Sequence, residues 1–197
     1  MAKSKIISGC EVVVIGGSAG SLKVLLQILP NLTAIPTFSI VIILHRKNAE
    51  DSTLEELIAM KTTLPVKEVE DKTLLEPGFI YIAPSDYHLL FEKNGLLSLD
   101  ISEKVNYSRP SIDVSFESAS EVYKSSLVGI LLSGANSDGT QGLKAIQNAD
   151  GKTIVQKPDT AEMPFMPNHA IQNTTPDFIL NIEEMLLLLE SINSNLL

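Results

Sequence analysis

The sequence predicts an α/β fold with three layers, αβα, in which a mostly parallel open sheet lies between helices and carries an antiparallel β-hairpin insertion. Four apolar segments rich in β-branched residues show little polar alternation, which is typical of strands buried on both faces of a parallel sheet. Segments with helical periodicity lie between these strands, so the elements alternate as they do in βαβ units.

The predicted elements follow one another along the whole chain. The strands are expected at Glu11–Gly16, Phe38–His45, Gly78–Pro84 and Leu127–Gly134, with a shorter one at Lys152–Gln156. The helices are expected at Ser21–Leu29, Ser52–Met60, Asp113–Tyr123, Gly139–Asn148 and Ile182–Ile192. Asn94 and Gly95 separate two short apolar runs, a pattern that favours a tight turn, so a β-hairpin is expected at about Tyr87–Asp100.

Length and composition limit the class of protein. A chain of 197 residues with 44% apolar residues can form one domain with a sizeable core, so residues 1–197 are expected to form a single domain. The apolar runs are shorter than the roughly 20 residues that cross a bilayer, and the N-terminal segment has no signal-peptide pattern. Together with the lone cysteine, Cys10, this indicates a cytoplasmic protein without membrane insertion. The net charge of −9 argues against a nucleic-acid partner.

The turn from Gly16 to Gly20, in "VVVIGGSAGS", follows the first strand and has more than one interpretation. A glycine-rich turn between a strand and a helix can hold a dinucleotide phosphate, but "GGSAGS" does not match G-x-G-x-x-G. The turn also reads as G-x-S-x-G, which would expose the Ser18 hydroxyl as a nucleophile. A third interpretation is an ordinary turn in which Ser18 only caps the helix.

Two further residues favour the nucleophile interpretation. A serine hydroxyl needs a histidine as base and a carboxylate to orient that histidine. His45 ends the second predicted strand, and Asp138 follows a later one, so both share the carboxyl edge of the sheet with Ser18 if the strands are parallel. Asp138 could instead cap the next helix. The other two histidines, His88 and His169, do not end central strands and are expected to be structural or exposed, His169 in a proline-rich loop. The order Ser, His, Asp also differs from that of the α/β-hydrolases.

The chain resembles the catalytic domain of the chemotaxis protein-glutamate methylesterases, the CheB family, from about Val12 to Leu189. Six blocks in the family's order carry the resemblance: "VVVIGGSAGS", "ILHRK", "EPGFIYIAPSDYHLLF", "SRPSIDVSFESAS", "VGILLSGANSDGTQGLKAI" and "TIVQKPDTAEMPFMPNHAI". The resemblance implies hydrolysis of glutamyl methyl esters on the cytoplasmic helices of chemoreceptors, together with glutamine deamidation in many members. This reaction is expected to need no cofactor and no metal.

Carried over by residue, the resemblance implies that Ser18 is the nucleophile, His45 the base and Asp138 the orienting carboxylate. Backbone N–H groups near Ala19 and Ala135 would hold the oxyanion. Arg109 matches a family arginine near the site and is a candidate for substrate binding, although a solvated loop cation is an equal alternative. The proline-bounded "MPFMP", residues 163–167, is expected to form a wall of the cleft.

The sequence departs from the family pattern at several positions. Ser21 replaces the last glycine of G-x-S-x-G-G, Ala19 replaces a threonine, and "SGANSDG" replaces T-G-M-G-x-D-G. The N-terminal receiver domain of many members is expected to be absent, since the first strand starts near Glu11. A catalytically idle domain of the same fold that binds receptor or signalling proteins is therefore an alternative, and a nucleotide-binding domain is a third.

Overall fold

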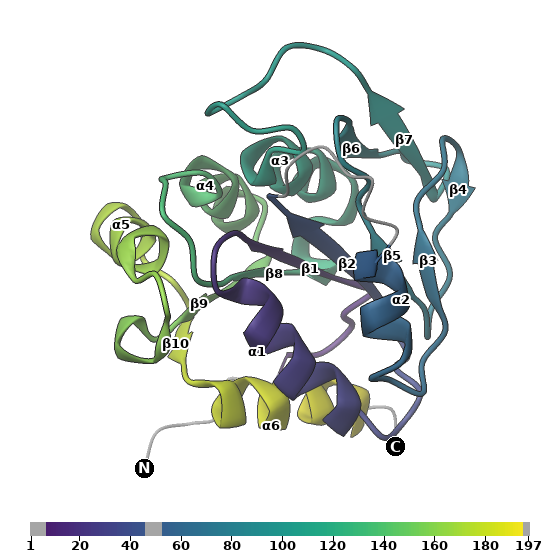
Figure 1. The fold of residues 1–197 in the computed structure, drawn as a ribbon, viewed down its shortest axis with the longest axis horizontal. Helices are drawn as coiled ribbons and strands as arrows, with labels where there is room; N and C mark the ends of the chain where they lie inside the picture. The colour runs from purple at the N-terminus through teal and green to yellow at the C-terminus, as the bar shows by residue number, and fades with distance from the viewer. Residues whose placement is uncertain (1–6, 46–52, 195–197) are drawn as a thin grey trace.

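In the computed structural model, which describes residues 7–45 and 53–194, parallel strands form the central sheet. Among the described residues this sheet has seven strands in the order β10-β9-β8-β1-β2-β5-β3 (Figure 1). The strands are β1 (Val12–Gly17), β2 (Ser39–Leu44), β3 (Val66–Glu68), β5 (Ile80–Ile82), β8 (Leu127–Leu131), β9 (Lys152–Gln156) and β10 (Phe178–Leu180). Every neighbouring pair is parallel, so all the carboxyl ends lie at one edge.

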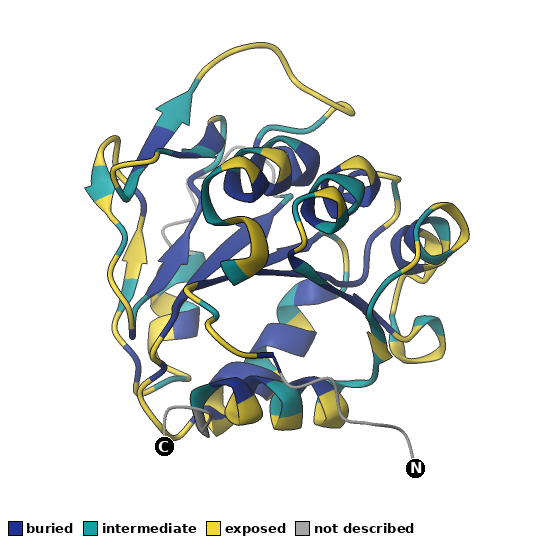
Figure 2. Cartoon of the chain, turned by 180° about the vertical axis from the view of Figure 1, so that it is seen from behind, coloured by how far each residue is buried: buried dark blue, intermediate teal, exposed yellow. Residues whose placement is uncertain are grey.

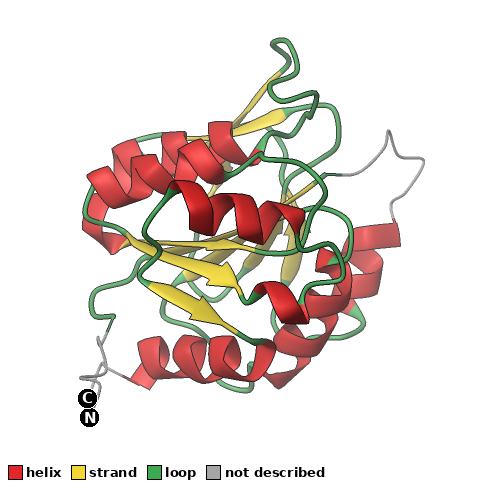
Figure 3. Cartoon of the chain, turned by 90° about the vertical axis from the view of Figure 1, so that its left-hand side faces the viewer, coloured by secondary structure: helices red, strands yellow, loops and turns green. Residues whose placement is uncertain are grey.

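Helices cover both faces of the sheet and complete the three predicted layers (Figures 1 and 3). One face carries α1 (Ser21–Ile28), α2 (Thr53–Ala59) and α6 (Ile182–Ser194), and the other carries α3 (Ile112–Tyr123) and α4 (Thr140–Asn148). The helix α5 (Phe165–Asn173) flanks α4 and β9. Short 3₁₀ turns follow α1, α3 and β9, at Leu29–Asn31, Lys124–Ser126 and Pro158–Thr160.

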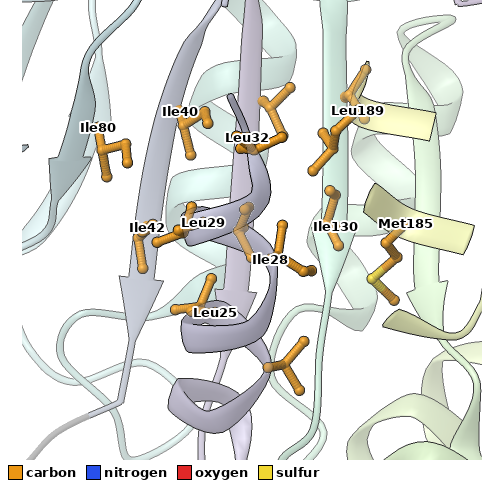
Figure 4. Packing of buried hydrophobic residues seen from close by; sticks show 14 of the residues in the cluster. Leu25, Ile28, Leu29, Leu32, Ile40, Ile42, Ile80, Ile130, Met185 and Leu189 are labelled. Carbon is orange, nitrogen blue, oxygen red and sulfur yellow. The ribbon is translucent and has the colours of Figure 1, made fainter. Parts of the chain in front are cut away.

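The core follows from this layering, because the central strands are apolar on both sides. On the α1 face, Leu25 and Ile28 of α1 lie over the sheet and belong to the same buried apolar cluster as Met185 of α6 (Figure 4). On the other face, Phe116 of α3 lies over glycines, and a Cβ on Gly142 would come within 2.4 Å of the Phe116 Cβ. Figure 2 shows buried residues on the inward surfaces of the helices and exposed residues on the outward ones. Each fully buried aliphatic side chain stabilises the fold by about 1.5–3 kcal/mol.

A second, antiparallel sheet contains the predicted hairpin. It has the order β4-β7-β6, from β4 (Thr73–Leu74), β6 (His88–Phe91) and β7 (Leu96–Asp100). The α/β class, the parallel sheet and the antiparallel insertion are thus confirmed. The connection from β7 to α3, residues 101–111, arches outward in Figure 1, and most of it is exposed. We call it the strap loop.

The structure also differs from the sequence-based expectations. The segments that form β3, β4, β10 and α5 were not predicted as elements, and His169 lies on α5 and not in a loop. Pro167 does not prevent this helix because it is the third residue of α5, where its missing N–H would have had no intrahelical partner. The first predicted residue of the helix Ser52–Met60 lies outside the described residues.

Candidate active site

Ser18 and His45 lie side by side at the carboxyl edge of the sheet. The parallel register pairs Gly17 with Leu44, the last residues of β1 and β2, and the His45 N–H donates to the Gly17 carbonyl at 3.1 Å. Ser18 and His45 are the next residues on strands that stand about 4.8 Å apart. Asp138 reaches the same edge from the loop between β8, on the other side of β1, and α4. The strand order therefore gathers the three predicted residues at one place.

The turn that carries Ser18 is fixed by hydrogen bonds to the loop after β8. The Ser133 carbonyl accepts from the Ser18 N–H at 2.9 Å and from the buried Ser21 hydroxyl at 2.7 Å. In return, the Ser133 hydroxyl donates to the Ala19 carbonyl at 2.7 Å. Ser21 and Ser133, two departures from the family pattern, thus join the turn to the neighbouring loop.

Gly20 is required in this turn by its backbone conformation. Its φ is 84°, in the left-handed region, and it precedes the first residue of α1. A Cβ at this position would lie 2.7 Å from the Ser133 hydroxyl oxygen. Only glycine combines this φ with so close an approach.

His45 and Asp138 form a direct hydrogen bond. His45 Nε2 lies 2.7 Å from Asp138 Oδ2, and the side chains are 12% and 0% exposed. Because the carboxylate can only accept, Nε2 carries the proton and Nδ1 is left as the basic nitrogen. Nδ1 faces the Ser108 hydroxyl at 3.4 Å. Within the described part of the chain, the Ser18 hydroxyl makes no hydrogen bond, so the structure joins two of the three residues and places the third beside them.

Asp138 does not cap α4, whose N-cap is Gly139 with no side-chain hydrogen bond. Its carboxylate lies at the N-terminus of α3 instead, where it accepts from the Ile112 N–H at 2.7 Å, the Asp113 N–H at 3.0 Å and the Ser111 hydroxyl at 3.0 Å. The free N–H groups and the dipole of a helix N-terminus stabilise a negative charge. The carboxylate is therefore held by α3 while it orients His45.

A second carboxylate, Asp113, lies beside Asp138. Burial would raise the pKa of Asp138, but hydrogen bonds from His45, from the Asp113 and Ile112 N–H groups and from Asn106 outweigh burial and lower it. The pKa of Asp113 is raised to about 6, first by burial and then by the charge of Asp138, against the hydrogen bond from the Gly142 N–H. The site thus contains one carboxylate held in its charged form and one that takes up a proton more readily.

Backbone donors are present where the oxyanion was expected. The Gly134 N–H is used, since it donates to the Met163 carbonyl at 3.0 Å. Within the described residues, the N–H groups of Ala19 and Ala135 make no hydrogen bond to the protein. Both are therefore free to bind an oxyanion.

Arg109 is engaged with the strap loop. Its Nη1 donates to the carbonyls of Ile101 and Ser102, both at 2.7 Å, across the base of the loop. This contact closes residues 101–109 into a ring, so the guanidinium holds the loop in shape. Substrate binding by Arg109 stays a prediction.

The two remaining histidines have defined partners. His88 is buried, accepts from the Ser111 N–H through Nδ1 at 3.2 Å and donates from Nε2 to the Glu103 carbonyl at 2.9 Å. His169 Nδ1 lies 2.9 Å from the Thr140 hydroxyl. Both contacts are of a structural kind.

The segment 163–167 lies beside the serine turn through Gly134. A Cβ on Gly134 would lie 2.5 Å from the Met166 methyl group and 3.1 Å from the Ser18 Cβ. Residue 134 must therefore be small for Met166 and the serine turn to approach each other.

Four polar residues of the site were not predicted: Asn106, Ser108, Ser111 and Asp113. Ser111 could have been found, because a serine just before a helical pattern is an N-cap signal and the structure shows it as the N-cap of α3. The contact of Asn106 with Asp138 joins residues 32 positions apart, and no local pattern marks it. Among the described residues, no group of three or more His, Cys, Asp or Glu side chains could hold a metal ion. None of the described helices has the length and hydropathy of a transmembrane span.

The parallel sheet and the serine, histidine and carboxylate at its carboxyl edge define an α/β domain with the residue set of a serine hydrolase. Comparison with known proteins specifies the class further. The chain belongs to the CheB methylesterase family, whose family model matches residues 13–189. This membership favours the serine interpretation of the Gly16–Gly20 turn over the dinucleotide one.

Named relatives and a solved structure agree with this assignment. A Leptospira interrogans protein named "Putative protein-glutamate methylesterase/protein-glutamine glutaminase" is 43% identical over 185 residues, which cover 94% of this chain and 96% of that protein. The Thermotoga maritima protein-glutamate methylesterase/protein-glutamine glutaminase is 36% identical, over 88% of this chain and 51% of that protein. The crystal structure of the Thermotoga maritima CheB methylesterase catalytic domain superimposes with a TM-score of 0.87 at 34% identity, covering 92% of this chain and 98% of that one.

Proposed function

We propose that this chain is a serine hydrolase that removes methyl esters from glutamate side chains of chemoreceptors. The observation that carries the proposal is the 2.7 Å contact between His45 Nε2 and Asp138 Oδ2 at the strand edge where Ser18 is the neighbouring residue. The names of the relatives supply the substrate class, because both include protein-glutamate methylesterase. The substrate would be the cytoplasmic helices of a methyl-accepting receptor, which would place this domain in the cytoplasm.

The reaction follows from the roles of the three side chains. Ser18 Oγ attacks the ester carbonyl and gives its proton to His45 Nδ1, while Asp138 holds Nε2–H and stabilises the imidazolium. The N–H groups of Ala19 and Ala135 hold the oxyanion. The tetrahedral intermediate collapses, methanol leaves with the proton from His45, and a water activated by His45 releases the glutamate. No cofactor or metal takes part in this scheme.

The same acyl-enzyme chemistry extends to glutamine side chains, with ammonia as the leaving group in place of methanol. The names of the relatives include protein-glutamine glutaminase, which supports this second activity. Hydrolysis of both substrates by one serine predicts that one substitution abolishes both.

Methanol release from a methylated receptor tests the proposal. Ser18→Ala and His45→Ala are each expected to lower kcat by about 10⁴-fold or more, because the residues of a triad act as a unit. Ser191→Ala, an exposed serine of α6, is the matched control and should keep the parent rate. Equal rates for all four proteins would refute the proposal.

An idle domain that only binds receptor or signalling proteins is the second candidate. One observation favours it: the hydroxyl that faces His45 Nδ1 belongs to Ser108, and not to Ser18. A fluorophosphonate separates the candidates without a receptor. A competent site becomes covalently labelled at Ser18, whereas an idle site does not react.

A further inference from the structure

The Asn106 side chain joins the two buried carboxylates of the site. Its Nδ2 donates to Asp138 Oδ1 at 3.0 Å and to Asp113 Oδ2 at 2.8 Å. An amide nitrogen carries two hydrogens, so each carboxylate receives one. Asp138 and Asp113 are 0% and 5% exposed, so water can take over little of this role.

The strap loop holds Asn106 in place through contacts on both sides. Arg109 closes the base of the loop, and Val105 and Ser108 form a β-bridge around its tip. His88 donates to the Glu103 carbonyl at 2.9 Å. Asn106 has a φ of 50°, a left-handed conformation that asparagine tolerates better than most residues. The amide is therefore held by a defined loop.

Two neighbouring carboxylates in a buried site repel each other unless hydrogen-bond donors stabilise both charges or one of the carboxylates takes up a proton. Asp138 has to be ionised to keep the proton of His45 on Nε2. If the two carboxylates shared a proton, Asp138 would carry less negative charge, and its hydrogen bond from His45 Nε2–H would weaken. Each N–H donated by Asn106 favours the charged form of the carboxylate that it contacts.

We propose that Asn106 is a positioning residue of the hydrolytic site, which keeps Asp138 ionised and so keeps His45 Nδ1 free to act as the base. The inference rests on the proposed function, because it assigns Asn106 to the same serine chemistry. The raised pKa of Asp113, about 6, indicates how close the pair is to holding a proton near neutral pH. Asn106 acts through the carboxylates and does not itself react.

Other titratable groups surround the pair and belong to the parent background of any pH profile. On the described elements packed against the pair, they are His45 after β2, His88 on β6, Glu117, Glu121 and Tyr123 on α3, Lys144 on α4, and Glu103, Lys104, Tyr107 and Arg109 of the strap loop. Substitution of Asn106 by alanine leaves all of these groups in the chain. A shift between parent and variant therefore reports the lost amide.

The test is the pH profile of kcat/KM for methanol release, and of the rate of fluorophosphonate labelling at Ser18. Loss of a hydrogen bond raises the pKa of a buried carboxylate by about one to two pH units. The pH at which the pair of Asp113 and Asp138 takes up its first proton, and with it the low-pH limb, should therefore move upward from about 6 in Asn106→Ala. Asn106→Asp should shift the limb at least as far, since it replaces the donors by a third carboxylate. Ile101→Ala, a change at an exposed and uncharged side chain of the same loop, should keep the parent profile.

Melting temperatures at the assay pH show which variants are folded. A purely structural role for Asn106 would lower the rate by one factor at every pH and leave the limb where it is in the parent. A limb that stays in place in both folded Asn106 variants overturns the inference.

Failure of the proposed function gives a different result. A parent that labels with fluorophosphonate but releases no methanol contradicts the ester substrate, and the labelling profile still decides the role of Asn106. A parent that does neither overturns both.

Discussion

Asp138→Asn removes one charge from the centre of the site with almost no change in volume. In the parent, Oδ1 accepts from Asn106, Ser111 and the N–H groups of Asp113 and Gly139, and Oδ2 accepts from His45 and the Ile112 N–H. All of these partners donate. An asparagine must therefore direct its own NH₂ group at donors, whichever way the amide is turned.

The two orientations have different costs. With Nδ2 in the place of Oδ1, the amide faces four donors. The Ser111 hydroxyl can rotate to accept, and the Asn106 amide can accept only if its oxygen replaces its NH₂ group, but the two backbone N–H groups cannot accept. With Nδ2 in the place of Oδ2, the amide loses the Ile112 N–H alone, and His45 can accept through Nε2. The second orientation is favoured, and it moves the proton of His45 to Nδ1, where the base is needed.

The size of both effects follows. The wrong histidine tautomer costs about 10⁴ in kcat, or about 5.4 kcal/mol in activation free energy. One buried N–H without an acceptor costs about 1–3 kcal/mol of stability, and each kcal/mol lowers Tm by about 2–4 °C in a chain of this length.

The assays are methanol release from methylated receptor and thermal unfolding on the same preparations. Asp159→Asn is the matched control, because that carboxylate is 66% exposed and forms a surface ion pair with Lys157; it should keep the parent rate and Tm. An Asp138→Asn protein that is folded and retains a rate within tenfold of the parent would refute the argument from the tautomer.

Two further predictions concern the serine turn and the charge of Asp138. Ser21→Ala removes the hydroxyl that donates to the Ser133 carbonyl at 2.7 Å, and it should lower the free energy of unfolding in a urea titration by about 0.5–1.5 kcal/mol. Fluorophosphonate labelling at Ser18 should fall by more than the fraction of unfolded protein explains. Unchanged stability and labelling would contradict a role of Ser21 in holding the turn. Because the pKa of Asp138 lies below its ordinary value of 3.8, its charge stabilises the fold above that pH, and the contribution is lost as the pH falls towards about 2. The Tm difference between parent and Asp138→Asn should therefore shrink across this range, and a constant difference would contradict the assignment.

The parts of the fold that were predictable are those with long, one-sided or two-sided apolar patterns. β1, β2 and β8 are continuous β-branched runs buried on both faces, and Asn94-Gly95 marks the hairpin between β6 and β7. β3 and β10 have three residues each, which is too short for a period to show, and they exist because β5 and β9 offer an edge. The segment that forms α5 was interpreted as a loop because it contains prolines, although Pro167 lies in the first turn of α5, where a proline is tolerated.

The site was predictable where the position of a residue follows from a strand end. Ser18, His45 and Asp138 each come after a parallel strand, and the topology alone brings them to one edge. The supports of Asp138 come from the start of α3 and from the strap loop, which reach the site through tertiary contacts that have no local sequence pattern. The contacts of Arg109 show the same limit: the family resemblance made it a candidate for substrate binding, but no local pattern marks the hydrogen bonds from its Nη1 to carbonyls of its own loop.

The use of Nε2 by Asp138 has a consequence for how this site could be transplanted. Nδ1 is the ring nitrogen nearer the main chain, so a donor that serves it must lie close to the main chain of His45, as Ser108 of the strap loop does. Ser18 meets this condition because β1 is the neighbouring strand of β2, so for this nucleophile strand adjacency is a requirement of the chemistry as well as of the fold. A minimal catalytic cassette would keep β8, β1 and β2 as consecutive neighbours, together with the start of α3, the strap loop that carries Asn106 and the hairpin that carries His88, whereas β3 and β4 could be exchanged for other elements. A library that varies those outer elements and selects for labelling at Ser18 would locate the border of that cassette.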